Sequence, residues 1–466
     1  MIRVFKHYIP RSFLLLGLVE FCIFYASVYV AIDLRFTGYS IESEVIYGSL
    51  VYRAIVFAFV MQGSMTAMGL YWRNLREGMD WRFLLRLTTG FLIGYVLLSI
   101  AFYTFPDLMI GRGVLGIALL VSYAGILFAR YIYNIISDPE VMKRRVLILG
   151  AGKKAHQLDS LRRKSDWHGF HLIGYIHIPG EHDLVDKSKI LSTSQSLMGI
   201  VEEYEVDEII VAIDDRRKRF PVDEILECKM SGVNILDVTT FFERQTGKIR
   251  LETLHPSEMI FSDGFKHPVL SSYSKRAFDI LVSLFLLSLA WPIMILTALS
   301  ILIESRGKGS VLYRQERVGK GGVTFDVLKF RSMKIDAEKD GKPQWAKKND
   351  SRVTKNGRVI RLLRIDELPQ LFNVLKGEMS FVGPRPERPQ FVEQLSRVIP
   401  YYNLRHRVNP GITGWAQISY SYGSTDKDAI EKLQYDLYYI KNYSLLFDFV
   451  IIFQTAHTVL WGSGAR

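Results

Sequence analysis

Residues 277–303 read AFDILVSLFLLSLAWPIMILTALSILI, and the way this stretch meets a membrane decides the fold of the second half of the chain. It is longer than the roughly 20 apolar residues that cross a bilayer. Pro292 lies near its middle, where it removes a helix hydrogen bond, and basic residues flank both ends. We therefore predict a re-entrant helix over 275–303, broken at Pro292, which enters and leaves by the same face where protein covers the break. A kinked fifth span is the alternative.

Four earlier apolar stretches are also long enough to span a membrane. Basic residues precede the first stretch, separate the second from the third and follow the fourth, whereas the first loop is acidic. By the positive-inside rule, both ends of this group lie in the cytoplasm, and the chain after residue 134 starts on that side. The predicted spans are Ser12–Ile32, Leu50–Leu70, Phe83–Phe105 and Val114–Tyr133.

Composition narrows the class of protein further. The 466 residues carry a net charge of +12, and residues 271–466 hold 29 Lys and Arg against 18 Asp and Glu, so +11 of that charge lies there. This bias points to anionic partners such as phosphates, nucleic acid or the bilayer surface. The two cysteines provide no disulfide framework or thiolate metal site.

Residues 145–260 alternate between strand and helix patterns, which predicts a small parallel sheet with flanking helices. RRVLILGAG, residues 144–152, runs from a buried strand into a glycine turn. Gly150, Gly152 and Ala155 match the GxGxxA fingerprint of dinucleotide-binding folds and form a candidate nucleotide turn. The acidic residue expected about 20 positions later is not evident, so a Rossmann-like fold kept for structure or regulation is the alternative.

The residues after the apolar stretch carry the chemistry. Two short strands around a turn at residues 319–322 predict a hairpin, which places Lys329 and Arg331 on one strand face. Residues 364–388 read RIDELPQLFNVLKGEMSFVGPRPER, with the acid pair Asp366 and Glu367 followed by a stiff basic turn. Because Pro369 is tolerated only in a first turn, we expect a helix to begin at Asp366 and Glu367. Asp366 could then be simply its N-cap.

The same geometry suits phosphate chemistry. Adjacent helical residues point about 100° apart, so one carboxylate can attack phosphorus while the other holds Mg²⁺, a hard ion that prefers oxygen ligands. Prolines on both sides stiffen the backbone around Arg385. Cations predicted around the acids suit a diphosphate, and the two prolines of the turn belong to the same predicted substrate-binding set. The cations are Lys329, Arg331, Arg352, Arg361, Arg364 and Arg385, and the prolines are Pro384 and Pro386.

KFRSM, RIDELPQLFNVLKGEMSFVGPRPERP and NPGITGWAQISY together resemble the bacterial polyprenyl-phosphate hexose-1-phosphate transferases, in particular the large members that initiate exopolysaccharide synthesis. The resemblance implies transfer of hexose-1-phosphate from a UDP-sugar to undecaprenyl phosphate, with release of UMP. It implies that Asp366 is the nucleophile, that Glu367 binds Mg²⁺, and that Arg361 and Arg385 handle the diphosphate or nucleotide. It also implies a re-entrant hairpin broken at Pro292, and a homodimer fits the family pattern.

The fold class predicted is therefore membrane α plus α/β. It comprises a four-helix transmembrane bundle (1–138), a Rossmann-like cytoplasmic domain (139–265) and a monotopic catalytic α/β domain with a re-entrant helix hairpin (271–466). The expected location is the bacterial inner membrane, multi-pass, with the catalytic domain on the cytoplasmic face. The expected partners are a UDP-sugar, undecaprenyl phosphate and membrane lipid, without nucleic acid.

Two other classes of protein combine an anchor with such domains. A membrane-bound nucleotide-sugar dehydratase or epimerase should carry a YxxxK pair, yet none of the 24 tyrosines has Lys four residues on. A non-enzymatic polysaccharide-export scaffold would explain the anchor and the basic charge, but not the acid pair beside an Arg-Pro turn. An ATP-driven exporter is not supported, because no Walker A motif occurs.

Overall fold

A computed structural model of the chain describes the residues of fourteen segments. The chain divides into two compact units, one running to Thr246 and one starting at Gly247, apart from short N-terminal pieces. Each unit is described by itself. The described segments are 2–4, 7–9, 11–36, 50–71, 81–136, 143–159, 170–191, 195–214, 220–251, 264–265, 269–334, 352–420, 423 and 425–460.

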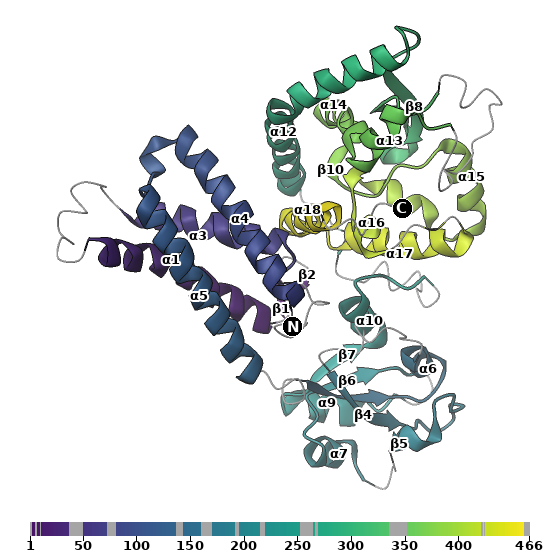
Figure 1. The fold of residues 1–466 in the computed structure, drawn as a ribbon. Coiled ribbons are helices and arrows are strands. Elements are labelled where there is room, and N and C mark those ends of the chain that lie inside the picture. Colours follow the sequence, from purple (N-terminus) through teal and green to yellow (C-terminus); the bar gives the residue numbers. More distant parts are fainter. Residues whose placement is uncertain are drawn as a thin grey trace. The chain divides into compact units, whose positions relative to one another are not determined.

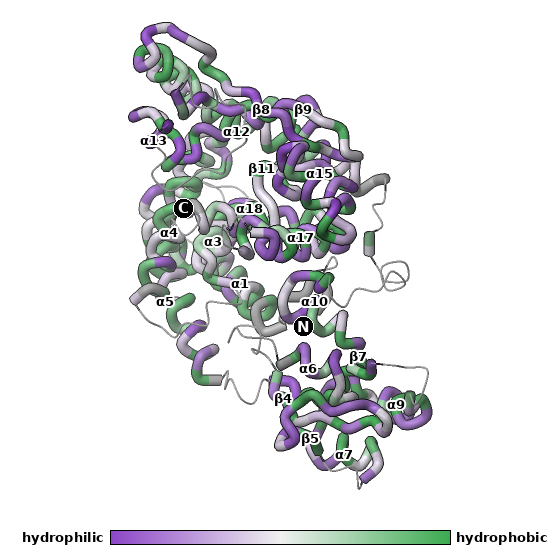
Figure 2. Tube along the Cα trace, turned by 90° about the vertical axis from the view of Figure 1, so that its right-hand side faces the viewer, coloured by the Kyte–Doolittle hydropathy of each residue, from purple (hydrophilic) through white to green (hydrophobic). Residues whose placement is uncertain are grey.

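The first unit opens with a short strand pair and four long apolar helices (Figure 1). Each helix coincides with a predicted span to within a few residues, so the four predicted segments are confirmed as helices long and apolar enough to cross a membrane. Hydrophobic residues line most of their length in Figure 2. The elements are β1 (Ile2–Val4), β2 (His7–Ile9), α1 (Arg11–Arg35), α3 (Leu50–Ala67), α4 (Trp81–Thr104), the 3-10 helix η1 (Pro106–Leu108) and α5 (Arg112–Ile136).

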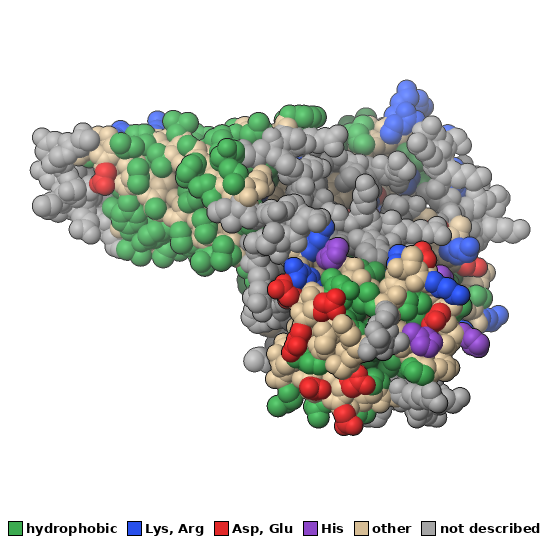
Figure 3. All heavy atoms as spheres, turned by 90° about the horizontal axis from the view of Figure 1, so that it is seen from below, with side chains coloured by type: hydrophobic (Ala, Val, Ile, Leu, Met, Phe, Trp, Pro, Cys, Tyr) green, Lys and Arg blue, Asp and Glu red, His purple; other side chains and the backbone are tan. Residues whose placement is uncertain are grey.

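The four helices share one buried core, and a polar contact crosses it. Glu20 of α1 is fully buried and accepts hydrogen bonds from Arg130 of α5 at 2.5 and 3.1 Å. The hydroxyl of Tyr71 donates to the same carboxylate, and Arg130 also donates to the carbonyl of Leu70. Apolar side chains cover much of the outer surface of these helices in Figure 3. This polar contact joins α1 to α5 within the apolar core that the helices share.

The first unit also contains a five-stranded, all-parallel sheet in the order β5-β4-β3-β6-β7, with helices on both faces. Two hydrophobic clusters pack on the two faces. This confirms the predicted small parallel sheet. Its elements are β3 (Arg144–Leu149), α6 (Lys153–Asp159), β4 (Phe170–Ile176), the 3-10 helix η3 (Lys187–Lys189), β5 (Ile190–Leu191), α7 (Leu197–Glu203), β6 (Glu208–Val211), α9 (Val222–Met230), β7 (Asn234–Asp237) and α10 (Val238–Thr246).

The second unit begins earlier than the predicted start at residue 271. The indole of Trp415 donates to the carbonyl of Gly247 at 2.7 Å, and the amide of Ile249 donates to Gln434. Lys248 forms an ion pair with Glu431 at 2.6 Å. These contacts, together with the burial of Ile249 and Leu251 in a hydrophobic cluster of that unit, attach residues 247–251 to the second unit.

The second unit is a mixed α/β assembly led by one long apolar helix. The predicted hairpin is confirmed, because β8 pairs with β9 in antiparallel register. Its elements are α12 (Val269–Glu304), β8 (Leu312–Val318), η4 (Lys320–Gly322), β9 (Thr324–Phe330), α13 (Lys355–Leu362), η5 (Ile365–Glu367), α14 (Gln370–Lys376), β10 (Ser380–Val382), α15 (Pro389–Val398), η6 (Tyr402–Arg407), β11 (Gly411–Thr413), α16 (Trp415–Ser419), α17 (Asp426–Lys441) and α18 (Leu445–Leu460).

Helix α12 is the fifth helix in the described part of the chain that is long and apolar enough to span a membrane. It is helical throughout, with Pro292 inside it, and it changes direction along its length in Figure 1. A proline inside a helix is an established cause of such a bend. Residues near both ends contact other elements of the same unit. Lys275 pairs with Asp448 at 2.5 Å near the start, and Asn356 donates to the carbonyl of Ser300 near the end.

Candidate functional site

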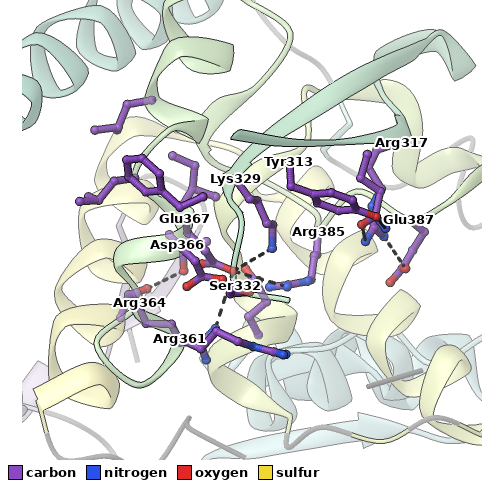
Figure 4. Close-up of a pocket in the computed structure, with 18 of the residues that line it drawn as sticks. Tyr313, Arg317, Lys329, Ser332, Arg361, Arg364, Asp366, Glu367, Arg385 and Glu387 are labelled. Atoms are coloured by element: carbon purple, nitrogen blue, oxygen red, sulfur yellow. Dashed lines mark hydrogen bonds and ion pairs between the residues drawn. The ribbon is translucent and has the colours of Figure 1, made fainter. Parts of the chain in front are cut away.

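A cavity of about 1070 Å³ opens in the second unit and collects the predicted site residues. Its polar lining includes the acid pair and every cation that was predicted to surround it. Figure 4 shows Lys329, Arg361, Arg364 and Arg385 around the acid pair. The cationic lining residues predicted from sequence are Lys329, Arg331, Arg352, Arg361, Arg364 and Arg385.

The acid pair lies in a single 3-10 turn, Ile365–Glu367, ahead of helix α14. Arg364 precedes it in the left-handed region, with φ of 59°, a conformation that costs a non-glycine residue free energy. The helix predicted to begin at the acid pair begins later, at Gln370, directly after Pro369. The alternative, that Asp366 is the N-cap of this helix, is wrong. Pro369 occupies the N-cap position, and Asp366 lies in the 3-10 turn ahead of it.

Three cations surround the carboxylate of Glu367. Its Oε1 lies 3.3 Å from Lys329 Nζ, 3.6 Å from Arg385 Nη2 and 3.7 Å from Arg364 Nη1. Burial raises the pKa of Glu367, but Lys329, Arg385 and Arg364 outweigh it and lower the pKa to about 2. Glu367 is therefore an anion at any physiological pH.

Asp366 has the opposite environment. Its side chain is buried, and its Oδ1 accepts no hydrogen bond from any residue that the structure describes. Burial, together with the neighbouring charge of Glu367, raises the pKa of Asp366, although Lys329 and Arg361 act against the shift. Two adjacent carboxylates with pKa values moved apart indicate two different tasks. A buried carboxylate oxygen without a partner is one that a ligand can meet.

The remaining predicted cations hold separate positions around the cavity. Arg331 lies just beyond β9 and donates to the carbonyl of Lys308 at 3.1 Å, so it lines the cavity while Lys329 reaches the acid pair. Arg361 is in the last turn of α13. Arg352 lies at the isolated bridge that precedes the same helix.

The basic turn, residues 383–388, follows strand β10, which pairs in parallel with β11. Its Gly383 is required by space, because a Cβ there would lie 2.3 Å from the carbonyl oxygen of Asn409. Arg385 extends from this turn toward Glu367 (Figure 4), as the sequence predicted. Pro384 and Pro386 flank it in the backbone and are absent from the cavity lining that the structure describes.

Several charged lining residues were not predicted from the sequence. Arg317 on β8 pairs with Glu387 at 3.5 Å, and Arg405 pairs with Asp436 at 2.8 Å. Glu387 lies in the basic turn of the quoted motif and could have been found there. Arg405 and Asp436 are 31 residues apart, and no local pattern connects them.

One wall of the cavity is apolar and belongs partly to the long helix. Leu289 and Ile293 of α12 line it and are exposed elsewhere on their surfaces, at 60% and 48%. The cavity therefore reaches from the acid pair to the apolar flank of α12. Its apolar lining comprises Leu286, Leu289, Ala290, Ile293, Leu362, Leu368, Leu371, Phe381 and Ile412, among others.

The candidate nucleotide turn lies in the first unit, and a carboxylate of the same unit occupies it. The carboxylate of Asp214, past the end of β6, accepts hydrogen bonds from the amides of Lys153 and Lys154 at 2.8 and 2.9 Å. A Cβ on Gly152 would lie 2.3 Å from that carboxylate, and Gly150 has φ of +118°. Ala155 is buried in the core beneath the sheet. The glycines thus make room for a protein carboxylate where a phosphate would meet the first amides of α6.

Residues 270–462 match the family described as Bacterial sugar transferase. A UDP-glucose:undecaprenyl-phosphate glucose-1-phosphate transferase of Escherichia coli K12 is 32% identical over 91% of this chain and 92% of its own length. The chain belongs to the bacterial sugar transferase family.

Other relatives of this family differ in the sugar that their names specify. The same name is borne by a Klebsiella pneumoniae protein that is 34% identical over 85% of each chain. An Aeromonas hydrophila UDP-N-acetylgalactosamine-undecaprenyl-phosphate N-acetylgalactosaminephosphotransferase is 43% identical, but the match spans only 52% of this chain and 56% of that protein. The family inferred from the sequence motifs is thereby confirmed.

Proposed function

We propose that this bacterial sugar transferase moves hexose-1-phosphate from a UDP-sugar to undecaprenyl phosphate, as the first membrane step of exopolysaccharide or capsule synthesis. The observation that carries the proposal is the buried acid pair. Asp366 keeps one carboxylate oxygen without a partner among the described residues, beside a Glu367 that three cations hold ionised. The names of the full-length relatives support the same two substrates.

In the first step, a carboxylate oxygen of Asp366 attacks the β-phosphorus of the UDP-sugar. A bond forms between that oxygen and phosphorus, and the bond from phosphorus to the bridging oxygen breaks, so UMP leaves with the electron pair. In the second step, a phosphate oxygen of undecaprenyl phosphate attacks the same phosphorus and releases the Asp366 carboxylate. The product is the lipid-linked diphosphate sugar, and the enzyme is regenerated.

The cations of the cavity stabilise the charge that moves through these steps. Phosphoryl transfer depends mostly on positioning and on electrostatic stabilisation. Arg385 offers a planar fork that matches phosphate oxygens. Arg361 lies close enough to Asp366 to lower its pKa. Both fit the role of holding the diphosphate against the nucleophile.

Mg²⁺ fits the acid pair as a partner shared with the substrate. The described residues contain no group of three or more His, Cys, Asp or Glu side chains that could hold an ion alone. Mg²⁺ is commonly held by one or two carboxylates plus substrate phosphates, and the ionised Glu367, next to the nucleophile Asp366, would supply such a carboxylate. When bound there, the ion would neutralise charge on the diphosphate.

We further propose that α12 is re-entrant at the cytoplasmic face of the inner membrane. Lys275 and Ser300 are 25 residues apart, so a straight helix would separate them by about 38 Å at 1.5 Å per residue. Both residues nevertheless contact other elements of one compact unit. Such a helix holds the cavity at the level of lipid phosphates, and its apolar wall suits the polyprenyl chain.

UMP release tests the proposal. Purified enzyme with undecaprenyl phosphate and Mg²⁺ is incubated with UDP-glucose, UDP-galactose, UDP-N-acetylglucosamine and UDP-N-acetylgalactosamine in turn. One or more should release UMP, and with the UDP-sugar alone the intact-protein mass should increase by one sugar phosphate. In Asp366→Asn both signals should vanish while the melting curve is kept. Near-normal turnover in that variant contradicts the nucleophile assignment.

A further inference from the structure

Four hydrogen bonds from other parts of the unit hold the backbone of the basic turn. The carbonyl oxygens of four successive residues accept hydrogen bonds from four partners outside the turn. The donors are Gly411 N to Pro384 O at 2.9 Å, Arg405 Nη2 to Arg385 O at 2.9 Å, Arg317 Nη1 to Pro386 O at 3.1 Å, and Val318 N to Glu387 O at 2.9 Å.

Two of these four donors are side chains, and neither belongs to the predicted cationic set. Arg405 is buried and bonds Tyr402 Oη at 2.7 Å and Asp436 Oδ2 at 2.8 Å as well as the turn. Its guanidinium thus has a fixed direction before it meets the carbonyl of Arg385. A buried arginine with an ionised partner keeps its charge and its orientation.

Arg317 approaches the neighbouring carbonyl from strand β8. Its Nη2 donates to Gln315 Oε1 at 2.5 Å, and the same guanidinium pairs with Glu387 at 3.5 Å. The two arginines therefore hold adjacent peptide units of the turn from different elements, η6 and β8. The side chain of Arg385 leaves the backbone at the Cα directly before the first of these peptide units, and its Nη2 lies 3.6 Å from Glu367 Oε1.

We propose that Arg405 and Arg317 are positioning residues for the reaction, which act by fixing the backbone of the turn so that the guanidinium of Arg385 stays aimed at the acid pair. Two prolines alone limit the φ of their own residues but do not place the turn relative to Glu367. The carbonyl contacts supply that placement, and a shift of about 1 Å in such a group costs roughly 100-fold in rate. This inference rests on the proposed function.

A double-mutant cycle in the full chain tests it. Arg405→Lys keeps a positive charge near Asp436, but it loses the fork that bonds Tyr402, Asp436 and the turn together. We expect Arg405→Lys to lower kcat about 10- to 100-fold with a smaller change in KM. In an Arg385→Ala background the same substitution should change kcat less than threefold, because its route of action is already gone. An equal loss in both backgrounds overturns the proposal.

Arg317→Gln is the second arm, since Arg317 is less buried than Arg405 and its loss endangers folding less. It should show the same dependence on Arg385. Arg397→Gln, which removes an exposed arginine paired with Glu393 on α15, is the matched control and should leave kcat unchanged in both backgrounds. If the wild-type enzyme releases no UMP from any UDP-sugar, the proposed function fails; an active wild type with additive cycles refutes the positioning roles alone.

Discussion

Lys329 Nζ lies 3.3 Å from Glu367 Oε1, and this contact joins the second strand of the hairpin to the acid turn. Burial lowers the pKa of Lys329, and the charge of Glu367 offsets this only in part, so that pKa stays below its ordinary value. Each group nevertheless stabilises the charged form of the other. The pair also separates the behaviour of Glu367 from that of its neighbour Asp366.

Replacing Lys329 should impair the reaction without unfolding the protein. Lys329→Met removes a cation from the carboxylate of Glu367, and hydrogen bonds to charged groups contribute about 1.5–3 kcal/mol, which corresponds to a rate loss of roughly 10- to 100-fold. UMP release under saturating substrates measures it. Lys320→Met, at the exposed tip of the same hairpin, should retain full activity, and equal losses in both variants would point to damage of the hairpin itself.

The pH dependence should show the raised pKa of Asp366. Its carboxylate must be ionised to attack, so the rate falls as the pH falls through a pKa that lies above that of an ordinary aspartate. Glu367, with a pKa of about 2, stays ionised across the range. Single-turnover transfer measured against pH should thus show one acid limb.

Arg361 lowers the pKa of Asp366, so its removal should shift that limb in a known direction. In Arg361→Gln the pKa of Asp366 rises further, and the acid limb of the residual activity moves to higher pH. Arg358→Gln removes an exposed arginine from the same helix and should leave the limb in place. A shift to lower pH in Arg361→Gln would show that Asp366 is not the ionising group.

The bend in α12 should control membrane topology. In a chain whose Cys22 and Cys228 are replaced by alanine, Tyr273→Cys and Lys308→Cys place one thiol near each end of the helix. A membrane-impermeant maleimide should label both from the same side of sealed vesicles. Pro292→Leu restores a helix hydrogen bond and should raise the fraction of Lys308→Cys labelled from the opposite side. Labelling of the two ends from opposite sides in the Pro292 chain would refute the re-entrant arrangement.

The glycine turn after β3 should not take up a dinucleotide. The amides that would meet a pyrophosphate already donate to Asp214, and the carboxylate would repel the phosphates. Titration of the full chain with NADH, followed by nucleotide fluorescence, should give no saturable binding. Saturable binding that Gly152→Val abolishes would contradict this, and Gly152→Val is the control because its side chain would fill the same space.

Local patterns in the sequence were sufficient for the elements and for most of the site. The length of the apolar stretches located the apolar helices, because a membrane span needs about 20 consecutive apolar residues. Alternation predicted the parallel sheet, and the glycines of the hairpin turn predicted the pairing of β8 with β9. Asp366, Glu367 and Arg385 were found because they lie within one short motif, where spacing along the chain limits distance in space.

Tertiary structure decided which of those groups work together. The turn that carries the acid pair is a 3-10 helix entered through a left-handed Arg364, and local propensity does not favour that conformation at arginine. Arg405 contacts the carbonyl of Arg385, 20 residues away, and the carboxylate of Asp436, 31 residues away. Asp214 accepts a hydrogen bond from the amide of Lys154, 60 residues before it. Such contacts depend on how distant segments pack, because a side chain's partner is fixed by the shared core and not by its neighbours in sequence. The sequence alone thus determined which chemical groups the chain carries and on which elements, while the fold determined their burial, their partners and so their pKa values.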